Sequence, residues 1–234
     1  MTGSVLNKLE LDVMQINELL DASEIVSKYK MPSMVVHPNL AAEAMAARMR
    51  VKGRYKIIIP IDWPKGENYG NIKFRGVSKS ALECDGFEIY LTPNKTENDI
   101  KNEAKVLTEF IKAHLGDYVE VRFVIGNLSK NKDEIISICK GLLSIRSPTL
   151  IRSDISLKLQ QNKANSDAHN DFCETITASG LHCPIKLSGN MNNLRSITSA
   201  PNVLRYATGV SQAKIIIKEY TQQPIELREI LADS

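Results

Sequence analysis

Short apolar, β-branched segments alternate along the chain with longer amphipathic ones. The apolar segments recur every 25 to 35 residues or so, roughly the interval expected when strands are separated by helices. Their length and their flanking turn residues indicate buried strands rather than helices. We therefore predict eight strands, at residues 8–13, 33–38, 56–61, 87–93, 119–126, 149–154, 184–189 and 202–208.

The intervening segments carry the apolar spacing of helices. Residues 39–49 and 97–114 are the clearest examples, and the second places Ile100, Ala104 and Leu107 on one helical stripe. Eight strands that alternate with helices in a chain of 234 residues predict an α/β fold, specifically a single (β/α)8 TIM barrel. An open doubly wound sheet is the alternative.

The whole chain, residues 1–234, is predicted to form one domain, because no linker or low-complexity tract divides it. The tail, residues 221–234, predicts a short closing helix that begins at Pro224.

Composition excludes several classes of protein. The chain has 30 basic and 27 acidic residues, which are scattered, so we expect neither nucleic acid nor membrane as a partner. No apolar run approaches the roughly 18 residues that cross a bilayer, and the N-terminus lacks the pattern of a signal peptide. The four cysteines form no C-x-x-C pair, which argues against a zinc site or a disulfide framework and favours a reducing compartment. Glycine-rich nucleotide loops are also absent from the sequence. We expect a cytoplasmic protein without metal or cofactor.

Several segments resemble one enzyme family, the deoxyribose-phosphate aldolases, which are class I aldolases on a (β/α)8 barrel. The resemblance runs from about Pro32 to Ile216 and rests on the order and spacing of short motifs. These are PSMVVHPNLAAEA (32–44), IIIPIDWPKG (57–66), CDGFEIYL (84–91), SPTLIRSDIS (147–156), CPIKLSGNM (183–191) and LRYATGVS (204–211).

The resemblance implies that two catalytic positions have been substituted. The imine-forming lysine of the family falls on Arg152, whose guanidinium stays protonated and cannot condense with a carbonyl. The proton-shuttling aspartate falls on Tyr90, which carries no charge at neutral pH. Only the second lysine of the family, which lowers the pKa of its neighbour, has a counterpart, Lys186.

The phosphate-binding end of the family site is altered as well. Its paired glycines fall on Gly189 and Asn190, and its final serines on Gly209 and Val210. Backbone N–H groups there still suit an anion. The remaining candidate ligands are the side chains of Arg152, Ser188, Thr208 and Ser211.

Lys186 has three interpretations that the sequence leaves open: an anion-binding or imine-forming lysine, a lysine paired with an acid inside the barrel mouth, or a solvated residue at a strand end. Arg152 and Asp154 form either a structural ion pair or, for Arg152, an anion clamp. Lys158 is the residue to which the imine chemistry would have to relocate. Asp12 is a candidate acid at the end of the first strand.

Three further residues at strand ends have mainly structural interpretations. His37 precedes Pro38 and reads as a turn residue with a satisfied hydrogen bond. Asp62 reads as a helix cap or as a partner that orients a lysine, and Trp63 as a packing residue.

The leading hypothesis is a non-catalytic aldolase-like barrel that acts as a structural, inhibitory or assembly protein, with a protein partner or a second copy of itself. A phage origin would fit this role, and the protein would then reside in the host cytoplasm or the virion. The first alternative is an active Schiff-base lyase that acts on a phosphorylated sugar or another small anionic carbonyl compound through Lys186. The second alternative is a sensor that binds a sugar phosphate without turning it over.

Overall fold

The computed structural model describes residues 5–68, 70–81, 83–125, 128, 130–145, 149–153, 173–188 and 203–223. Side chains are described throughout these ranges except for residues 149–153 and 188. Five of the predicted features lie outside the described residues. They are Asp154, Lys158, Gly189, Asn190 and the closing helix beyond residue 223.

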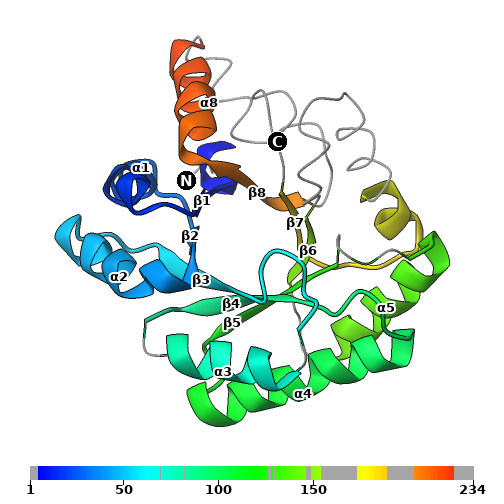
Figure 1. The fold of residues 1–234 in the computed structure, drawn as a ribbon. Coiled ribbons are helices and arrows are strands. Elements are labelled where there is room, and N and C mark those ends of the chain that lie inside the picture. The colour runs from blue at the N-terminus through cyan, green and yellow to red at the C-terminus, as the bar shows by residue number, and fades with distance from the viewer. Residues whose placement is uncertain are drawn as a thin grey trace.

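The strands form a parallel sheet that curls into a barrel (Figure 1). Neighbours in sequence pair with each other, and the last strand pairs with the first, which closes the ring. Each strand overlaps the segment predicted for it. The strands are β1 (Leu9–Val13), β2 (Ser33–Val36), β3 (Lys56–Ile61), β4 (Gly86–Tyr90), β5 (Glu120–Val124), β6 (Thr149–Ser153), β7 (Ile185–Ser188) and β8 (Val203–Gly209).

Helices cover the outside of this sheet (Figure 1). They are α1 (Leu19–Lys28), α2 (Ala41–Arg50), α3 (Gly70–Ser80), α4 (Glu97–Leu115), α5 (Lys132–Ser144) and α8 (Val210–Gln222), with short 3-10 turns at η1 (Val5–Lys8), η2 (Ile16–Glu18) and η3 (Pro38–Leu40). Residues 173–178 are also helical. The α/β class and the curled parallel sheet are thus confirmed, whereas the complete set of eight β/α units stays a prediction. Within the described part of the chain, none of these helices has the length and apolarity to span a membrane.

Local sequence explains where the longest helices begin and end. The hydroxyl of Thr96 accepts a hydrogen bond from the Asp99 backbone N–H at the start of α4. Asn131 and Glu134 form a reciprocal capping box at the start of α5. α4 ends at Gly116, whose φ of 85° is accessible to glycine at little cost.

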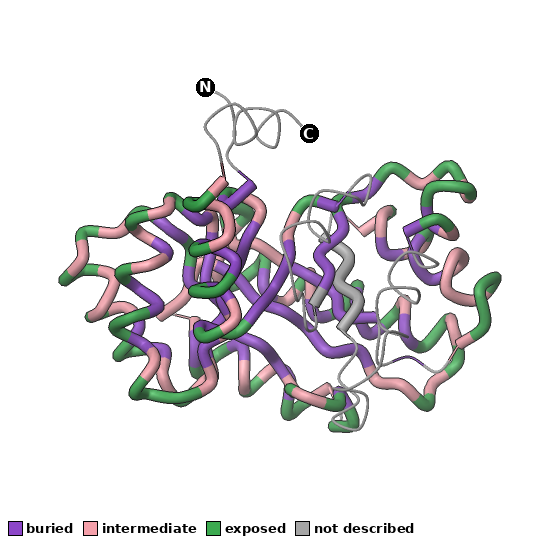
Figure 2. Tube along the Cα trace, turned by 90° about the horizontal axis from the view of Figure 1, so that it is seen from above, coloured by how far each residue is buried: buried purple, intermediate pink, exposed green. Residues whose placement is uncertain are grey.

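The two faces of the sheet have different chemistry. On β1, the alternate residues Leu9, Leu11 and Val13 point outward and pack against the helices. The intervening residues, Glu10 and Asp12 on the same strand, point toward the barrel axis. Figure 2 shows the strands buried along most of their length beneath helices whose outer faces are exposed. The barrel axis therefore holds a group of residues distinct from the outer apolar core.

Candidate functional site

Lys186 lies at the centre of a charged cluster inside the barrel. It is the second residue of β7, and its side chain is almost fully buried. The Nζ ammonium contacts a carboxylate oxygen of Glu10 from β1 and one of Glu88 from β4. Of the three interpretations open from the sequence, the structure shows the lysine paired with acids.

Arg122 extends the cluster across the barrel. This residue of β5 is fully buried, and its guanidinium lies 2.7 Å from Glu10, 2.9 Å from Glu88 and 2.7 Å from Glu120. It also donates a 3.2 Å hydrogen bond to the hydroxyl of Ser33 on β2. Four strands thus contribute to one buried ion network.

The network fixes the protonation of its members. Burial alone would lower the pKa of Lys186, but the carboxylates of Glu10 and Glu88 outweigh burial and raise that pKa above its ordinary value. Burial likewise disfavours the Glu10 carboxylate, yet Arg122 and Lys186 bring the pKa of Glu10 well below its usual range. Lys186 is therefore an ammonium ion at neutral pH, and a protonated amine is not a nucleophile.

Asp12 follows Glu10 by two residues on β1 and lies nearer the C-terminal end of that strand. Its Oδ1 atom is buried 3.9 Å from the Lys186 Nζ and has no hydrogen-bond partner among the described residues. Burial, reinforced by the nearby Glu88 and Glu10 carboxylates against the attraction of Lys186, raises the pKa of Asp12 to about 7. The expected acid at the end of the first strand is present, and it titrates near neutrality.

The structure separates the other predicted site residues into two groups. Tyr90 on β4 and Gly209 on β8 lie on the inner face of the barrel. Tyr90 pairs with Val124, which faces inward, and Gly209 pairs with Asp12. Thr208 pairs with Leu11 and is buried on the face that packs against the helices, so its hydroxyl does not face the mouth with Gly209.

Near the start of α8, Gly209 and Ser211 are exposed. Gly209 is the N-cap of α8, and within the described part of the chain no side chain caps this end of the helix. The backbone N–H groups of the first turn are therefore available to an anion.

β6 places Arg152 in register with Leu187 and Ile151 in register with Lys186. The register fixes only the backbone position of Arg152, so its role as an anion clamp stays a prediction.

A second buried charge cluster joins α3, α4 and the end of β4. The Lys73 Nζ donates hydrogen bonds of 2.6 Å to Glu103, 2.6 Å to the Tyr90 carbonyl and 3.0 Å to the Thr92 hydroxyl. Its ammonium also lies 3.5 Å from Asp62. Every donor position of this lysine is used, which indicates a structural brace between the two helices.

The residues at the ends of β2 and β3 have largely the predicted roles. The His37 ring accepts a hydrogen bond from the Asn39 backbone N–H, 3.2 Å long, in the turn before α2. Asp62 accepts from the Asn68 backbone N–H at 2.9 Å and also faces Lys73. Trp63 stands edge-on to His37 with ring centroids 6.1 Å apart, and it is 40% exposed, so it is only partly a packing residue.

Three of the four cysteines are buried apolar residues, as expected, whereas Cys84 is half-buried. Cys139, Cys173 and Cys183 are buried, and burial raises the pKa of the Cys139 thiol to about 12. Across the described ranges, no group of three or more histidine, cysteine or acidic side chains is arranged to hold a metal ion.

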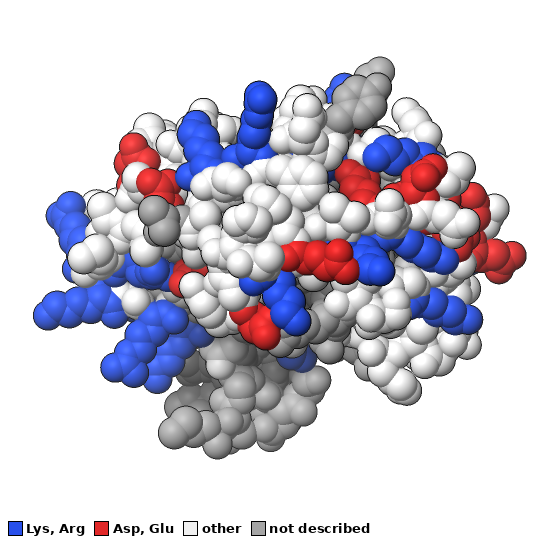
Figure 3. Space-filling view, turned by 90° about the horizontal axis from the view of Figure 1, so that it is seen from below, with Lys and Arg blue, Asp and Glu red and all other residues white. Residues whose placement is uncertain are grey.

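Surface charge is mixed on the side of the molecule shown in Figure 3. Lysine and arginine side chains alternate there with aspartate and glutamate, without a continuous field of one sign.

Sequence reasoning identified Lys186 and Asp12 but missed Glu10, Glu88 and Arg122. A signal for them exists, because each is a charged residue flanked on both sides by apolar residues within a predicted strand. Such a residue must point toward the barrel axis when its neighbours pack against helices. Lys73 offers no comparable signal, because charged residues are common in helices.

Solved structures with a similar fold include several aldolases. The chain superposes on the tetrameric deoxyribose-phosphate aldolase of Aeropyrum pernix with a TM-score of 0.76 and 9% identity, covering 93% of this chain and 91% of that one. A putative deoxyribose-phosphate aldolase from Coccidioides immitis gives a TM-score of 0.73 with 11% identity over 94% and 88% of the two chains. One from Toxoplasma gondii gives 0.70 with 14% identity over 94% of each.

At these identities the comparison establishes the fold and leaves the activity to the site itself. No family model and no curated protein matches the sequence.

Proposed function

We propose that this protein is a deoxyribose-phosphate aldolase-like (β/α)8 barrel that does not form an imine and that acts through assembly or interaction with other protein chains. The observation that carries the proposal is the pairing of Lys186 with Glu10 and Glu88. A Schiff-base enzyme needs a neutral amine in contact with its substrate. Here the one candidate amine on the inward face of β7 is charged, buried and enclosed by two carboxylates.

Borohydride trapping tests this proposal directly. The protein is incubated at pH 7.5 with a panel of aldehydes, ketones and sugar phosphates, reduced, digested and examined by mass spectrometry for a secondary amine at each lysine. We expect no adduct at Lys186 above the background at exposed lysines such as Lys105. An adduct at Lys186 would establish the alternative, a Schiff-base lyase.

A charge-preserving variant serves as the control. Lys186→Arg retains the cation between Glu10 and Glu88 but has no amine that can form an imine. If wild-type protein cleaves or forms a carbon–carbon bond in a substrate of the panel and Lys186→Arg does not, the non-catalytic proposal is wrong.

Assembly is the part of the proposal that concerns partners. The Aeropyrum pernix aldolase of the same fold is described as a tetramer, so this architecture is compatible with self-association. Sedimentation velocity over a range of concentrations would detect oligomers of this chain. A strictly monomeric protein would leave a heterologous partner as the only form of the interaction hypothesis.

A second candidate function is binding of a sugar phosphate without turnover. The exposed start of α8 at Gly209 supports it, because a methyl group added to Gly209 would meet no atom of the described residues within 4 Å, its chain neighbours apart. Titration with 2-deoxyribose 5-phosphate should then raise the unfolding midpoint with ligand concentration. An unchanged midpoint for every sugar phosphate tested would exclude this candidate.

A further inference from the structure

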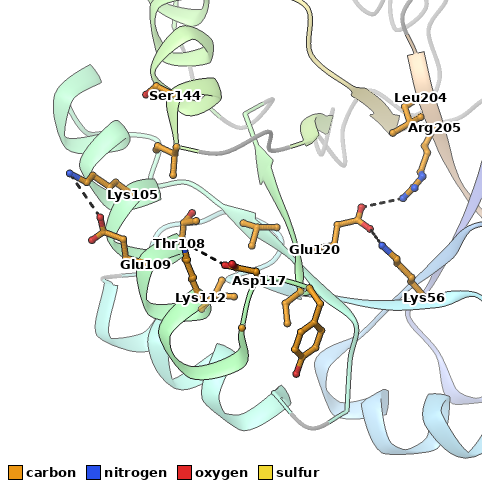
Figure 4. Close-up of a pocket in the computed structure, with 16 residues that line it drawn as sticks. Lys56, Lys105, Thr108, Glu109, Lys112, Asp117, Glu120, Ser144, Leu204 and Arg205 are labelled. Carbon is orange, nitrogen blue, oxygen red and sulfur yellow. Dashed lines mark hydrogen bonds and ion pairs between the residues drawn. The ribbon is translucent and has the colours of Figure 1, made fainter.

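A cavity opens at the end of the barrel opposite Asp12 and Gly209. Its volume is about 740 Å³, within the range of small-molecule sites. The cavity is lined by the second half of α4, the turn that follows it, and the first residues of β3, β5 and β8 (Figure 4). Because the strands are parallel, these first residues mark the N-terminal end of the barrel, which is normally a structural face.

Charged side chains from three strands converge on one wall of the cavity. Lys56 at the start of β3 lies 2.9 Å from Glu120 at the start of β5, and Arg205 of β8 lies 3.3 Å from the same carboxylate (Figure 4). Despite burial, Arg122, Lys56 and Arg205 lower the pKa of Glu120 to about 2, so Glu120 is an anion at all physiological pH values. The Glu120 carboxylate is thus the counter-ion of both Lys56 and Arg205, which face the cavity.

The opposite wall adds no net charge. Lys105 lies 4.0 Å from Glu109 and Lys112 lies 3.6 Å from Asp117, so these four residues pair with each other. Among the described residues that line the cavity there are four cations and three carboxylates. One positive charge is left in excess, at the wall formed by Lys56 and Arg205.

Arg205 has donors that its described contacts do not use. All of its hydrogen bonds and ion pairs to described residues run from Nη1, to Ser33 at 3.2 Å, to Glu120 at 3.3 Å and to Glu10 at 3.8 Å. The guanidinium carries five N–H groups, and a carboxylate binds two of them in parallel. Its side chain is only 14% exposed, which strengthens any charge-assisted hydrogen bond formed there.

Apolar surface lies next to this charged wall. Leu204, adjacent to Arg205, is 43% exposed, and Val121 and Ile145 also line the cavity. From this arrangement we propose that the cavity binds a small monocarboxylic acid with an apolar body, its carboxylate held by Arg205 and Lys56. A single excess positive charge matches a monoanion and leaves a dianionic phosphate ester undercompensated.

Matched pairs of acids and amides test this site. Benzoate and 3-phenylpropanoate are titrated against the protein alongside benzamide and 3-phenylpropanamide, and binding is followed by calorimetry and by nuclear magnetic resonance. We expect an acid to bind about tenfold or more tightly than its amide, since the charge-assisted bidentate contact is lost in the amide. Equal binding of acid and amide, or no binding of either, would overturn the proposal.

Two variants locate the binding. Arg205→Lys keeps the charge but removes the planar donor edge, and we expect about a tenfold loss of affinity for the acid. The Lys56 side chain is half exposed, so Lys56→Met should fold normally. It therefore tests the same wall even if Arg205→Lys fails to fold. Lys214→Ala, which removes an exposed ion pair with Asp21 away from this cavity, is the control and should change affinity less than about twofold. Retained binding in Lys56→Met combined with loss in Asp12→Asn would place the ligand at the other end of the barrel and refute this site.

Discussion

Lys186, Glu10, Glu88 and Arg122 give this barrel an unusual interior. TIM barrels are typically filled by layers of branched apolar side chains. Here two cations and two carboxylates lie buried in the middle of the barrel and compensate each other. Such a network need not be more stable than apolar packing, but each member depends strongly on its partners.

Neutralising one carboxylate of this network should therefore destabilise the protein. In Glu88→Gln, Lys186 keeps Glu10 as its near counter-charge, and Arg122 keeps Glu10 and the partly buried Glu120. We expect the free energy of unfolding at pH 7 to fall by about 3 kcal/mol, as when one partner of a buried pair is removed. Denaturant unfolding measures it. Glu109→Gln, which removes one half of an exposed pair, should cost less than about 0.5 kcal/mol, and equal costs for the two variants would refute the network's importance.

Asp12 predicts a pH dependence with a definite sign. Its pKa is about 7 in the folded protein and 3.8 in a model peptide. Between these values the folded protein holds a proton that the unfolded chain has released, so this residue makes stability fall as pH rises from about 4 to about 7. Above that range the destabilisation is complete. The pKa values of Glu10 and Glu120 are lowered from 4.5 in the folded protein, so these two residues stabilise it above about pH 4.5 and lose that contribution only as the pH falls further.

Asp12→Asn removes that titration. Because the side chain is 32% exposed, we discount the full shift and expect the variant to be more stable than the parent protein by about 2 kcal/mol at pH 8. At pH 4 the two proteins should differ little. Unfolding curves collected at several pH values would show the difference, and a constant offset between the two proteins would contradict the assignment.

At the scale of the strands, a glycine permits β3, β4 and β5 to meet inside the barrel. A methyl group added to Gly86 would lie 2.7 Å from the Glu120 carbonyl oxygen and 2.9 Å from Ile58 Cδ1. The first of these contacts is with backbone and cannot relax by a change of rotamer. Space at this point, rather than a special φ, is what the glycine supplies.

Gly86→Ala should consequently shift the strands apart and lower the free energy of unfolding by about 2 kcal/mol. Gly70 is a matched control, because its added methyl group meets only Phe74, at an ordinary 3.8 Å. Gly70→Ala lies in the first turn of α3 and should not destabilise the protein. Thermal unfolding of both variants would test this, and similar midpoints would argue against close packing at Gly86.

The strands themselves could be read from the sequence, since a run such as Lys56–Ile61 is apolar, β-branched and bounded by turns. The same runs contain the charged residues of the site, but which of these residues form ion pairs depends on long-range strand pairing. Lys186 meets Glu88 across 98 residues, and Arg122 meets Glu10 across 112. Local patterns show that these side chains point inward, but they do not show which charges come into contact.

Family resemblance pointed to Lys186 as a surviving element of a reactive site. The contacts around it change that interpretation, because the ammonium is compensated instead of being poised to react. The cavity at the N-terminal end escaped prediction for a different reason. It is built from the first residues of three strands and the end of α4, which are adjacent only after the barrel has closed.

At the scale of the whole molecule, closure is the property on which both ends of the barrel depend. β1 pairs with β8 through four residue pairs, from Leu9 with Tyr206 to Asp12 with Gly209. This pairing brings Glu10 to Lys186 and holds Arg205 beside Ser33. An open sheet with the same strand order would leave β1 and β8 as edges with unpaired backbone groups.

Amide hydrogen exchange distinguishes these arrangements. In a closed barrel every strand has two neighbours. The amide exchange rates of peptides from β1 and β8 should therefore lie within about tenfold of those from β3 and β4. A factor of ten corresponds to a difference of about 1.4 kcal/mol in the free energy of opening. Tyr118, which is exposed in the turn between α4 and β5, supplies the fast-exchanging reference. Exchange from β1 and β8 that approached the rate of this turn would indicate two free edges. In that case neither the charge network at Lys186 nor the cavity wall at Arg205 would exist as described, so this measurement precedes the site variants.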